Sequence, residues 1–140
     1  MADLHRCEWC LGHENYVRYH DEEWGVPTHD DRDLFEFLIL EGAQAGLSWL
    51  TILNKREGYR EAFCDWDVEA VARLSDDYLE ALREEPKIIR NKLKIYSART
   101  NARAFIAVQE EFGSFDEYLW RFVDGEPIIN QFRTSSEVPA

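Results

Sequence analysis

The sequence predicts a single, all-α domain, and three observations support this prediction. Its 140 residues are 45% hydrophobic and 31% charged, which is ordinary for one globular domain with its own core. Apolar residues recur at helical spacing along most of the chain, whereas the alternating pattern of strands is nearly absent. No repeat, low-complexity tract or flexible linker divides the chain, so residues 1–140 are expected to form one domain.

Seven helices are expected. Their approximate ranges, in chain order, are 15–20, 30–46, 48–63, 67–73, 76–84, 91–113 and 114–123. Residues that favour N-caps stand at four of the starts, namely Asp30 or Asp31, Ser48, Ser75 and Ser114. Gly113 ends the longest helix, and Asp124-Gly125 turns the chain into an extended tail. In the helix that begins after Ser48, the charged residues expected to face solvent are Lys55, Arg56 and Glu57.

The charge balance excludes some partners and singles out one segment. Twenty-eight acidic residues against 16 basic ones give a net charge of −12, which disfavours nucleic acid and anionic membranes as partners of the average surface. Between Pro86 and Gln109, however, all six charged residues are basic: Lys87, Arg90, Lys92, Lys94, Arg99 and Arg103. This pattern suggests a local footprint for nucleic acid, although charge alone favours the alternative of a solvated helix face. No membrane span or signal peptide is found, so we expect a cytoplasmic protein without a membrane partner.

The cysteines and histidines near the N-terminus have two interpretations. Three cysteines, an odd number, argue against a disulfide framework and leave metal binding or free thiols. Cys7 and Cys10 have the spacing of a zinc knuckle, and His13 and His20 could complete a tetrahedral ligand set. In the other interpretation both cysteines are small buried apolar residues and His20 is a hydrogen-bonded core histidine.

A carboxylate inside an apolar stretch marks the candidate ligand site. Glu41 is surrounded by aliphatic residues, glycine and alanine, so it must be paired, protonated or exposed in a cleft. The small residues leave room for a ligand, Trp49 follows, and Tyr16 and Tyr19 lie one helical turn apart. A carboxylate among aromatic faces suits a flat cationic ligand. The alternative is that Glu41 pairs with an arginine while the aromatic residues belong to the core.

A further group of carboxylates, the acidic triplet 21–23, is not expected to work as an acid–base pair. Adjacent carboxylates on one segment point in different directions, whereas glycoside hydrolysis needs two that flank one bond. A solvated or capping role is expected instead.

Several long motifs carry a resemblance to a known family. They are Arg6-Cys7-x-Trp9, Tyr16-x-x-Tyr19-His20-Asp21-x-Glu23-Trp24-Gly25-Val26-Pro27, Leu40-Glu41-Gly42-x-Gln44-Ala45-Gly46-Leu47-Ser48-Trp49, Ile88-Ile89-Arg90-Asn91 and Asn101-Ala102-Arg103. Together they resemble the 3-methyladenine DNA glycosylase I family over essentially the whole chain. The resemblance implies a helix-hairpin-helix glycosylase fold and an enzyme that flips and excises 3-methyladenine from alkylated double-stranded DNA.

The resemblance also implies roles for individual residues. Glu41 would hydrogen-bond the excised base, Trp49 would stack on it, and Tyr16 would line the pocket with Tyr19 nearby. The family's hairpin matches 84–105, so the residues expected to contact DNA are Lys87, Arg90, Asn91, Lys92 and Lys94.

A structural zinc is implied as well, with Cys7 and His20 as two of its four ligands. The family pattern continues beyond the stretch matching 135–139 and supplies the remaining ligands there, so the zinc ligand set is incomplete in this chain. We interpret the chain as lacking the family's C-terminal segment, the alternative being a local site that adds Cys10 and His13.

Two other functions remain open at this point. A non-catalytic zinc- or DNA-binding relative would lose the pocket, whereas a nucleoside N-glycoside hydrolase would not need the basic hairpin. For the glycosylase we expect a monomer that cleaves only the N-glycosidic bond. Whether these 140 residues are active alone is left open.

Overall fold

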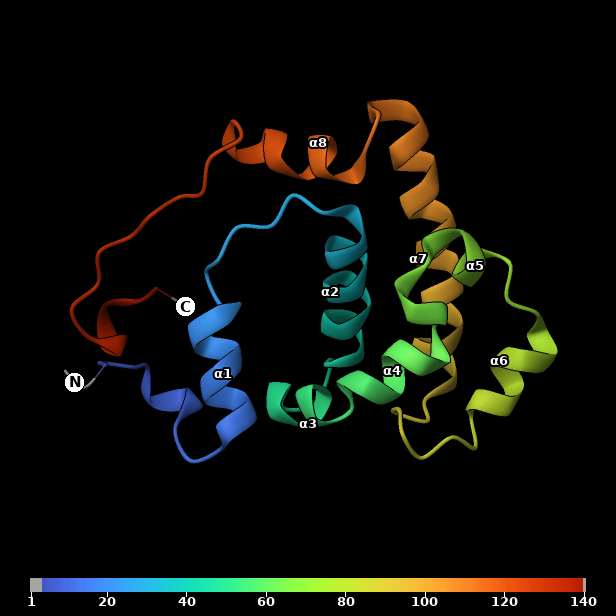
Figure 1. Cartoon of the computed structure of the whole chain (residues 1–140), viewed down its shortest axis with the longest axis horizontal. Helices are drawn as coiled ribbons and strands as arrows, with labels where there is room; N and C mark the ends of the chain where they lie inside the picture. Colours follow the sequence, from blue (N-terminus) through green and yellow to red (C-terminus); the bar gives the residue numbers. More distant parts are fainter. Residues whose placement is uncertain (1–3, 140) are drawn as a thin grey trace.

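Helix α7 (Lys92–Phe112) is the longest element of the fold (Figure 1). The computed structural model describes residues 4–139, and within this range it contains no strand, which confirms the all-α prediction. The other α-helices are α1 (Glu14–Glu22), α2 (Asp31–Ala43), α3 (Trp49–Asn54), α4 (Arg56–Ala62), α5 (Val68–Ala72), α6 (Asp76–Leu82) and α8 (Phe115–Trp120), and the short 3-10 helices are Glu8–Cys10, Cys64–Trp66, Arg121–Val123 and Ser135–Glu137. Helices α2, α5, α6 and α8 all pack against α7.

Side-chain caps start most of these helices, and the four predicted ones are confirmed. Those found are Asp30 for α2, Ser48 for α3, Asp67 for α5, Ser75 for α6, Asn91 for α7 and Ser114 for α8, and each accepts a hydrogen bond from an amide of the first turn. A cap of this kind contributes about 1 kcal/mol. Two helices are shorter than expected, because α2 ends at Ala43 rather than near Gly46 and α8 passes into a 3-10 turn after Trp120.

The helix predicted from Ser48 to Phe63 is broken at Lys55. Lys55 has φ −101° and ψ 5°, and it separates α3 from α4. The change of direction brings α4 against the turn before α7, where a Cβ on Gly58 would lie 2.3 Å from the carbonyl oxygen of Lys87. The expectation that Arg56 faces solvent is wrong, because its guanidinium is half-buried in ion pairs with Glu23 and Glu36.

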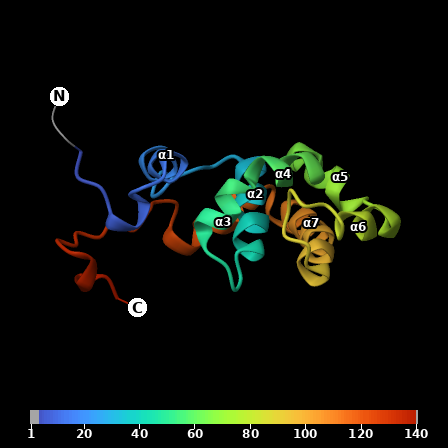
Figure 2. The ribbon, with the colours of Figure 1, turned by 90° about the horizontal axis from the view of Figure 1, so that it is seen from below.

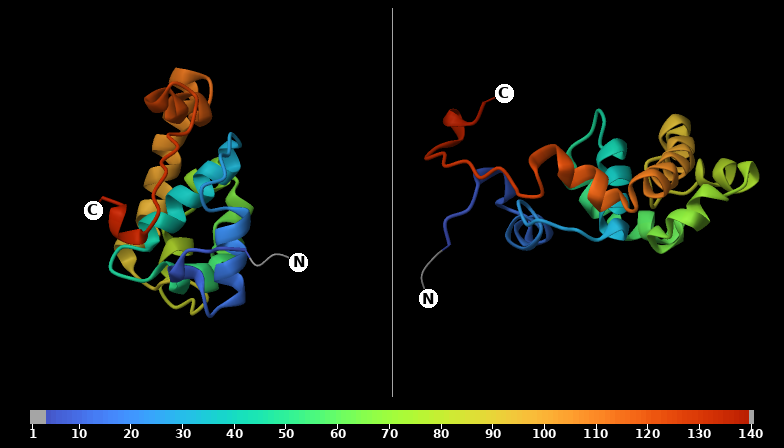
Figure 3. Two further views of the ribbon diagram at one scale, coloured as in Figure 1. Left: turned by 90° about the vertical axis from the view of Figure 1, so that its left-hand side faces the viewer. Right: turned by 90° about the horizontal axis from the view of Figure 1, so that it is seen from above.

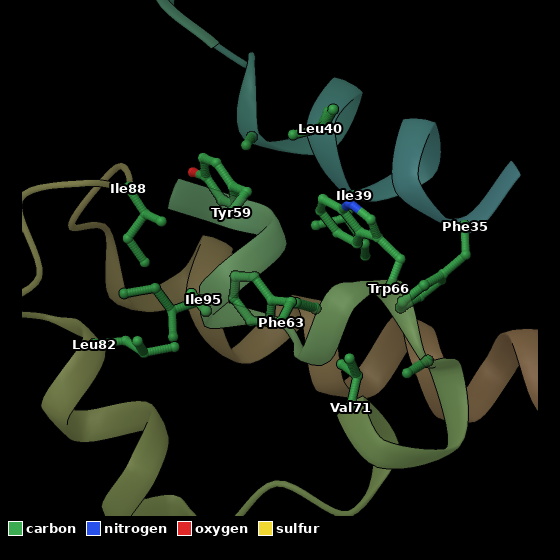
Figure 4. Close-up of a cluster of buried hydrophobic side chains, with 14 of the residues drawn as sticks. Phe35, Ile39, Leu40, Tyr59, Phe63, Trp66, Val71, Leu82, Ile88 and Ile95 are labelled. Atoms are coloured by element: carbon green, nitrogen blue, oxygen red, sulfur yellow. The ribbon is translucent and has the colours of Figure 1, made fainter. Parts of the chain in front are cut away.

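The hydrophobic core lies between α2, α4, α5, α6 and α7, and its buried members come from residues 34–105. Phe63 and Trp66 lie at its centre, with Phe35 and Ile39 on one side (Figure 4). Three aromatic rings contact one another there. The ring centroids of Phe63 and Trp66 are 6.4 Å apart with stacked planes, and those of Phe35 and Trp66 are 6.1 Å apart in an edge-to-face arrangement. Each buried side chain of this size contributes roughly 1.5–3 kcal/mol.

A left-handed turn carries Trp66 into this core. Cys64, Asp65 and Trp66 have φ values of 59°, 53° and 63°, a conformation that L-residues seldom adopt in succession. It costs roughly 1–2 kcal/mol per residue. The turn leaves the Trp66 side chain only 4% exposed between Phe35 and Phe63, and burial of this large ring offsets part of the cost.

The N-terminal segment and α1 lie at one end of an elongated molecule, away from α5, α6 and α7 (Figures 2 and 3). Within the described residues, no helix is long and apolar enough to span a membrane. The tail after Gly125 leaves α8 and returns along the outside toward the N-terminal end (Figure 1). Most of the helices therefore pack around α7, whereas α1 lies apart from α7 and packs against α3.

Candidate functional site

An aromatic cavity opens between α1 and the junction of α2 and α3. It has a volume of about 230 Å³. The residues that line it are Trp9, Tyr16, Tyr19, Trp24, Glu41, Gln44 and Trp49. The structure thus brings together all four residues that the sequence placed in the pocket, from segments more than twenty positions apart.

One wall of the cavity is formed by the N-terminal segment and α1. Trp9 is its centre, with ring centroids 5.1 Å from Tyr16, 5.3 Å from His20 and 5.6 Å from Trp24. Sequence reasoning did not single out Trp9 or Trp24 as pocket residues. The available signal was the density of aromatic residues between 9 and 24, which the helical period alone does not explain.

Tyr19 connects this wall to the other one. Its ring centroid lies 5.5 Å from that of Trp49 at the start of α3, with a tilt of 51° between the planes. Burial raises the pKa of the Tyr19 hydroxyl, and the nearby Glu41 carboxylate raises it further. Tyr19 therefore stays a neutral hydrogen-bond donor at the edge of the cavity.

The opposite wall carries the charge of the site. Glu41 lies in the last turn of α2 next to the fully buried Leu40, and its own side chain is exposed to the cavity. Among residues 4–139, no Lys, Arg or His nitrogen lies within 4.0 Å of its carboxylate, so the alternative of an arginine pair is wrong. The C-terminal end of a helix also carries negative potential. The cavity is thus suited to a flat, positively charged ligand.

The predicted hairpin is the turn between α6 and α7, and α4 holds it in place. Lys55 Nζ donates to the carbonyl oxygen of Pro86 at 2.9 Å, and the amide of Ile89 donates to the Tyr59 hydroxyl at 3.2 Å. Gly58 packs directly against the backbone of Lys87. These contacts fix the turn relative to the core.

Half of the basic segment has a structural use that the sequence did not predict. Lys94 Nζ donates to the carbonyl oxygens of Ala43 at 2.9 Å and Ala45 at 2.6 Å, so it closes the C-terminal end of α2 instead of reaching outward. Further along α7, Arg99 donates to the Leu74 carbonyl and Arg103 to that of Ala72. Carbonyl oxygens at helix ends lack hydrogen-bond donors within the helix, and these cations donate to them or to carbonyl oxygens just beyond the helix.

The outward-facing cations are Lys87, Arg90 and Lys92, all exposed around the start of α7. Asn91, predicted to contact DNA, uses its Oδ1 to cap α7 by accepting from the Lys94 amide. In the part of the chain that the structure describes, the amides of Arg90, Asn91 and Lys92 have no protein acceptor. Free amides at the N-terminus of a long helix favour an anion such as phosphate.

The described residues do not form a complete set of zinc ligands. Cys10 is buried and its Sγ donates to the Cys7 carbonyl oxygen at 3.1 Å, as expected of a small apolar residue, whereas Cys7 is exposed and the expectation that both cysteines are buried is wrong. Within residues 4–139, no three His, Cys, Asp or Glu side chains gather around a point that could hold a metal, so the local site with Cys10 and His13 is not formed. Cys7 and His20 supply two ligands where a structural zinc takes four. A zinc held through them stays a prediction.

His20 is nonetheless oriented by its neighbours. Its Nδ1 lies 2.9 Å from Asp21 Oδ1, and Asp21 also accepts a bidentate hydrogen bond from Arg6. Arg6, and then His20, lower the pKa of Asp21 to about 2. Instead of forming an acid–base pair, the acidic triplet therefore supplies Asp21 to this network and Glu23 to Arg56.

Comparison with known proteins agrees with this geometry. Residues 9–140 match the model of the methyladenine glycosylase family. The chain is 42% identical over 136 residues to DNA-3-methyladenine glycosylase 1 of Escherichia coli (strain K12), covering 97% of this chain and 73% of that protein. A crystal structure of 3-methyladenine DNA glycosylase I is 44% identical, with a TM-score of 0.92, and the match covers 96% of this chain and 74% of that one.

A second solved structure, of a variant 3-methyladenine DNA glycosylase I in complex with 3-methyladenine, is 35% identical with a TM-score of 0.92 over 96% of this chain and 72% of that one. Sequence and fold agree along nearly the whole chain, and the resemblance drawn from the motifs is confirmed. The chain therefore belongs to the methyladenine glycosylase family.

Proposed function

We propose that this protein excises 3-methyladenine from alkylated DNA by flipping the base into the aromatic cavity and hydrolysing its N-glycosidic bond. The observation that carries the proposal is the exposed Glu41 carboxylate, which has no ion-pair partner among residues 4–139 and faces a cavity lined by aromatic rings. The names of the relatives and the complex with 3-methyladenine support it. The proposal includes a double-stranded substrate, a monomeric enzyme and a cytoplasmic location.

The chemistry of the substrate explains why the cavity needs few catalytic groups. Methylation at N3 makes adenine a cation, so cleavage of its glycosidic bond releases a neutral base and needs little help from a general acid. The task of the enzyme is then mainly to select the damaged base and to hold it outside the helix.

Two interactions select the cation. Stacking of a desolvated cationic base on Trp49 or a neighbouring aromatic ring contributes about 2 kcal/mol or more. Glu41 adds a charge-assisted hydrogen bond to the ring edge, which a neutral adenine receives only weakly. Both interactions distinguish the alkylated base by its charge.

The reaction ends with hydrolysis of the glycosidic bond. No lysine is found among the described residues that line the cavity. We therefore assign no covalent amine intermediate, and we expect the DNA strand to remain intact after the base has left.

The DNA backbone would bind at the start of α7. Lys87, Arg90 and Lys92 supply positive charge there, and the free amides of the first turn supply hydrogen bonds to phosphate. The acidic remainder of the surface repels DNA, so one face binds it.

Release of 3-methyladenine from an alkylated duplex tests the proposal. The wild-type chain should liberate the free base, and Glu41→Gln should do so about 10- to 100-fold more slowly, because a hydrogen bond to a charged group contributes about 1.5–3 kcal/mol. Glu110→Gln, at an exposed position of α7 outside the cavity, is the matched control and should behave as wild type.

Two results would contradict the proposal and favour an alternative. Duplex binding without base release points to the non-catalytic relative. Hydrolysis of free nucleosides in preference to alkylated DNA points to the nucleoside hydrolase.

A further inference from the structure

The α1 wall of the cavity lies outside the hydrophobic core. The buried core residues all come from residues 34–105, whereas the wall consists of Trp9, Trp24 and the side chains of α1. Figure 1 shows α1 standing beside α2 and α3. The wall meets the core at its edge, where Tyr19 contacts Trp49, and burial inside the core does not by itself fix its position.

Besides the ring contact between Tyr19 and Trp49, a guanidinium makes a polar connection between this wall and the rest of the fold. Arg56, the first residue of α4, donates from Nη1 and Nη2 to the two carboxylate oxygens of Glu23, at 2.7 Å each. The same side chain donates from Nε to Glu36 at 2.8 Å. Glu23 is the C-cap residue that follows α1 and Glu36 belongs to α2, so Arg56 joins three helices at one point.

The arrangement is directional as well as charged. The fork from Arg56 to Glu23 needs a planar guanidinium and two parallel bonds, a geometry that a lysine ammonium does not reproduce. The side chain of Arg56 is 26% exposed and that of Glu36 is 13% exposed, so solvent screens these pairs only in part. The hydrogen bonds to Glu23 and Glu36 raise the pKa of Arg56 in spite of its burial.

A second cavity of about 370 Å³ lies next to α1, and it is lined mainly by polar and charged side chains that include Asn15, Asn54 and Arg60. Tyr19 lines both this cavity and the aromatic one. On the side of the polar cavity, Tyr19 shares the lining with Arg56 and its ion-pair partners Glu23 and Glu36.

We propose that Arg56 is a positioning residue for base excision, which acts through Glu23 and Glu36 to set the width of the aromatic cavity between α1 and α2. This inference rests on the proposed function. Arg56 is not among the residues that line the aromatic cavity. Its effect is exerted on Tyr16 and Tyr19 through the helix that carries them.

The test compares Arg56→Lys with Arg60→Gln. Arg60 lies one turn further along the same helix and lines the same polar cavity, but its partners are the exposed residues Glu57 and Asp65. Steady-state release of 3-methyladenine from alkylated duplex gives kcat and KM, and affinity for undamaged duplex is measured in parallel. Thermal unfolding gives the folded fraction of each variant.

We expect Arg56→Lys to lower kcat about tenfold and to leave KM and the affinity for undamaged duplex unchanged, because the DNA-binding face is intact. Arg60→Gln should match wild type in every measurement. Adding Glu23→Gln to Arg56→Lys should cause little further loss, because both substitutions break the same connection. If Arg56→Lys does not fold, Glu36→Gln, which retains the fork to Glu23, is the second variant, with a smaller fall in kcat expected.

Three outcomes would overturn the inference. The first is a wild-type kcat for folded Arg56→Lys. The second is a fall in the kcat of Arg56→Lys that the unfolded fraction of that variant fully explains, and the third is a fall in the kcat of Arg60→Gln as large as that of Arg56→Lys. Failure of the proposed function is distinct, since it would appear as a wild-type chain that releases no base.

Discussion

The two walls of the aromatic cavity are held by different forces. The α2–α3 wall grows out of the hydrophobic core, where Leu40 and Ile52 are fully buried. In the other wall Trp9 is 41% exposed and Trp24 is 55% exposed, and both the Tyr19–Trp49 contact and the ion pairs of Arg56 connect it to the core. The position of one wall therefore depends on burial in the core, whereas that of the other depends more on polar contacts near the surface.

The largest effect is expected in the wall that belongs to the core. Leu40→Ala removes a fully buried side chain from the last turn of α2 and should lower the free energy of unfolding by about 2–5 kcal/mol. Denaturant unfolding checks this value. Leu38→Ala, in the same helix but 39% exposed, is the control and should cost less. Equal losses would show that the α2 wall is not anchored by burial.

A glycine pair tests the attachment of the hairpin to this core. Gly58→Ala would place a Cβ 2.3 Å from the Lys87 carbonyl oxygen, so α4 and the turn must separate, at a cost of roughly 1–3 kcal/mol. The displaced turn should also bind duplex DNA more weakly. Gly42→Ala meets nothing within 4 Å and should leave the free energy of unfolding unchanged or raised. A tolerated Gly58→Ala would contradict the close packing of α4 on the turn.

Two cations of the basic segment should differ in their response to salt. Arg90→Ala should lower duplex affinity and reduce the slope of log affinity against log salt by about one, as for a phosphate contact. Lys94→Ala should keep the slope and lower the rate of excision, because Lys94 holds the carbonyl oxygens of Ala43 and Ala45 beside Gln44 of the cavity. Duplex binding measured at several salt concentrations distinguishes the two variants. Equal reductions of the slope in Arg90→Ala and Lys94→Ala would show that Lys94 also contacts DNA phosphates.

Local patterns predicted the helical fold well, because helical period and capping are set by residues close in sequence. Ser48 and Asn91 start their helices as expected. The break at Lys55 was missed, because it depends on how α4 packs against a turn that lies some thirty residues further along the chain. The left-handed turn at 64–66 has no glycine to reveal it.

The candidate site was predicted in part. Glu41 stood out because a carboxylate among apolar residues needs an explanation, and the resemblance placed Tyr16, Tyr19 and Trp49 beside it. Trp9 could not be placed without the contacts that fold the N-terminal segment onto α1. The internal role of Lys94 was hidden for the same reason, since charge in a sequence does not show which carbonyl oxygens lie within reach.

Binding of free 3-methyladenine to the wild-type chain and to Trp9→Ala tests most directly whether both walls hold the base. Titration calorimetry should show affinity reduced about tenfold or more in Trp9→Ala, which corresponds to roughly 1.4 kcal/mol of lost stacking. Because Trp9 is 41% exposed and outside the core, the free energy of unfolding should change by less than about 1 kcal/mol. Wild-type affinity in Trp9→Ala would contradict a cavity with two walls.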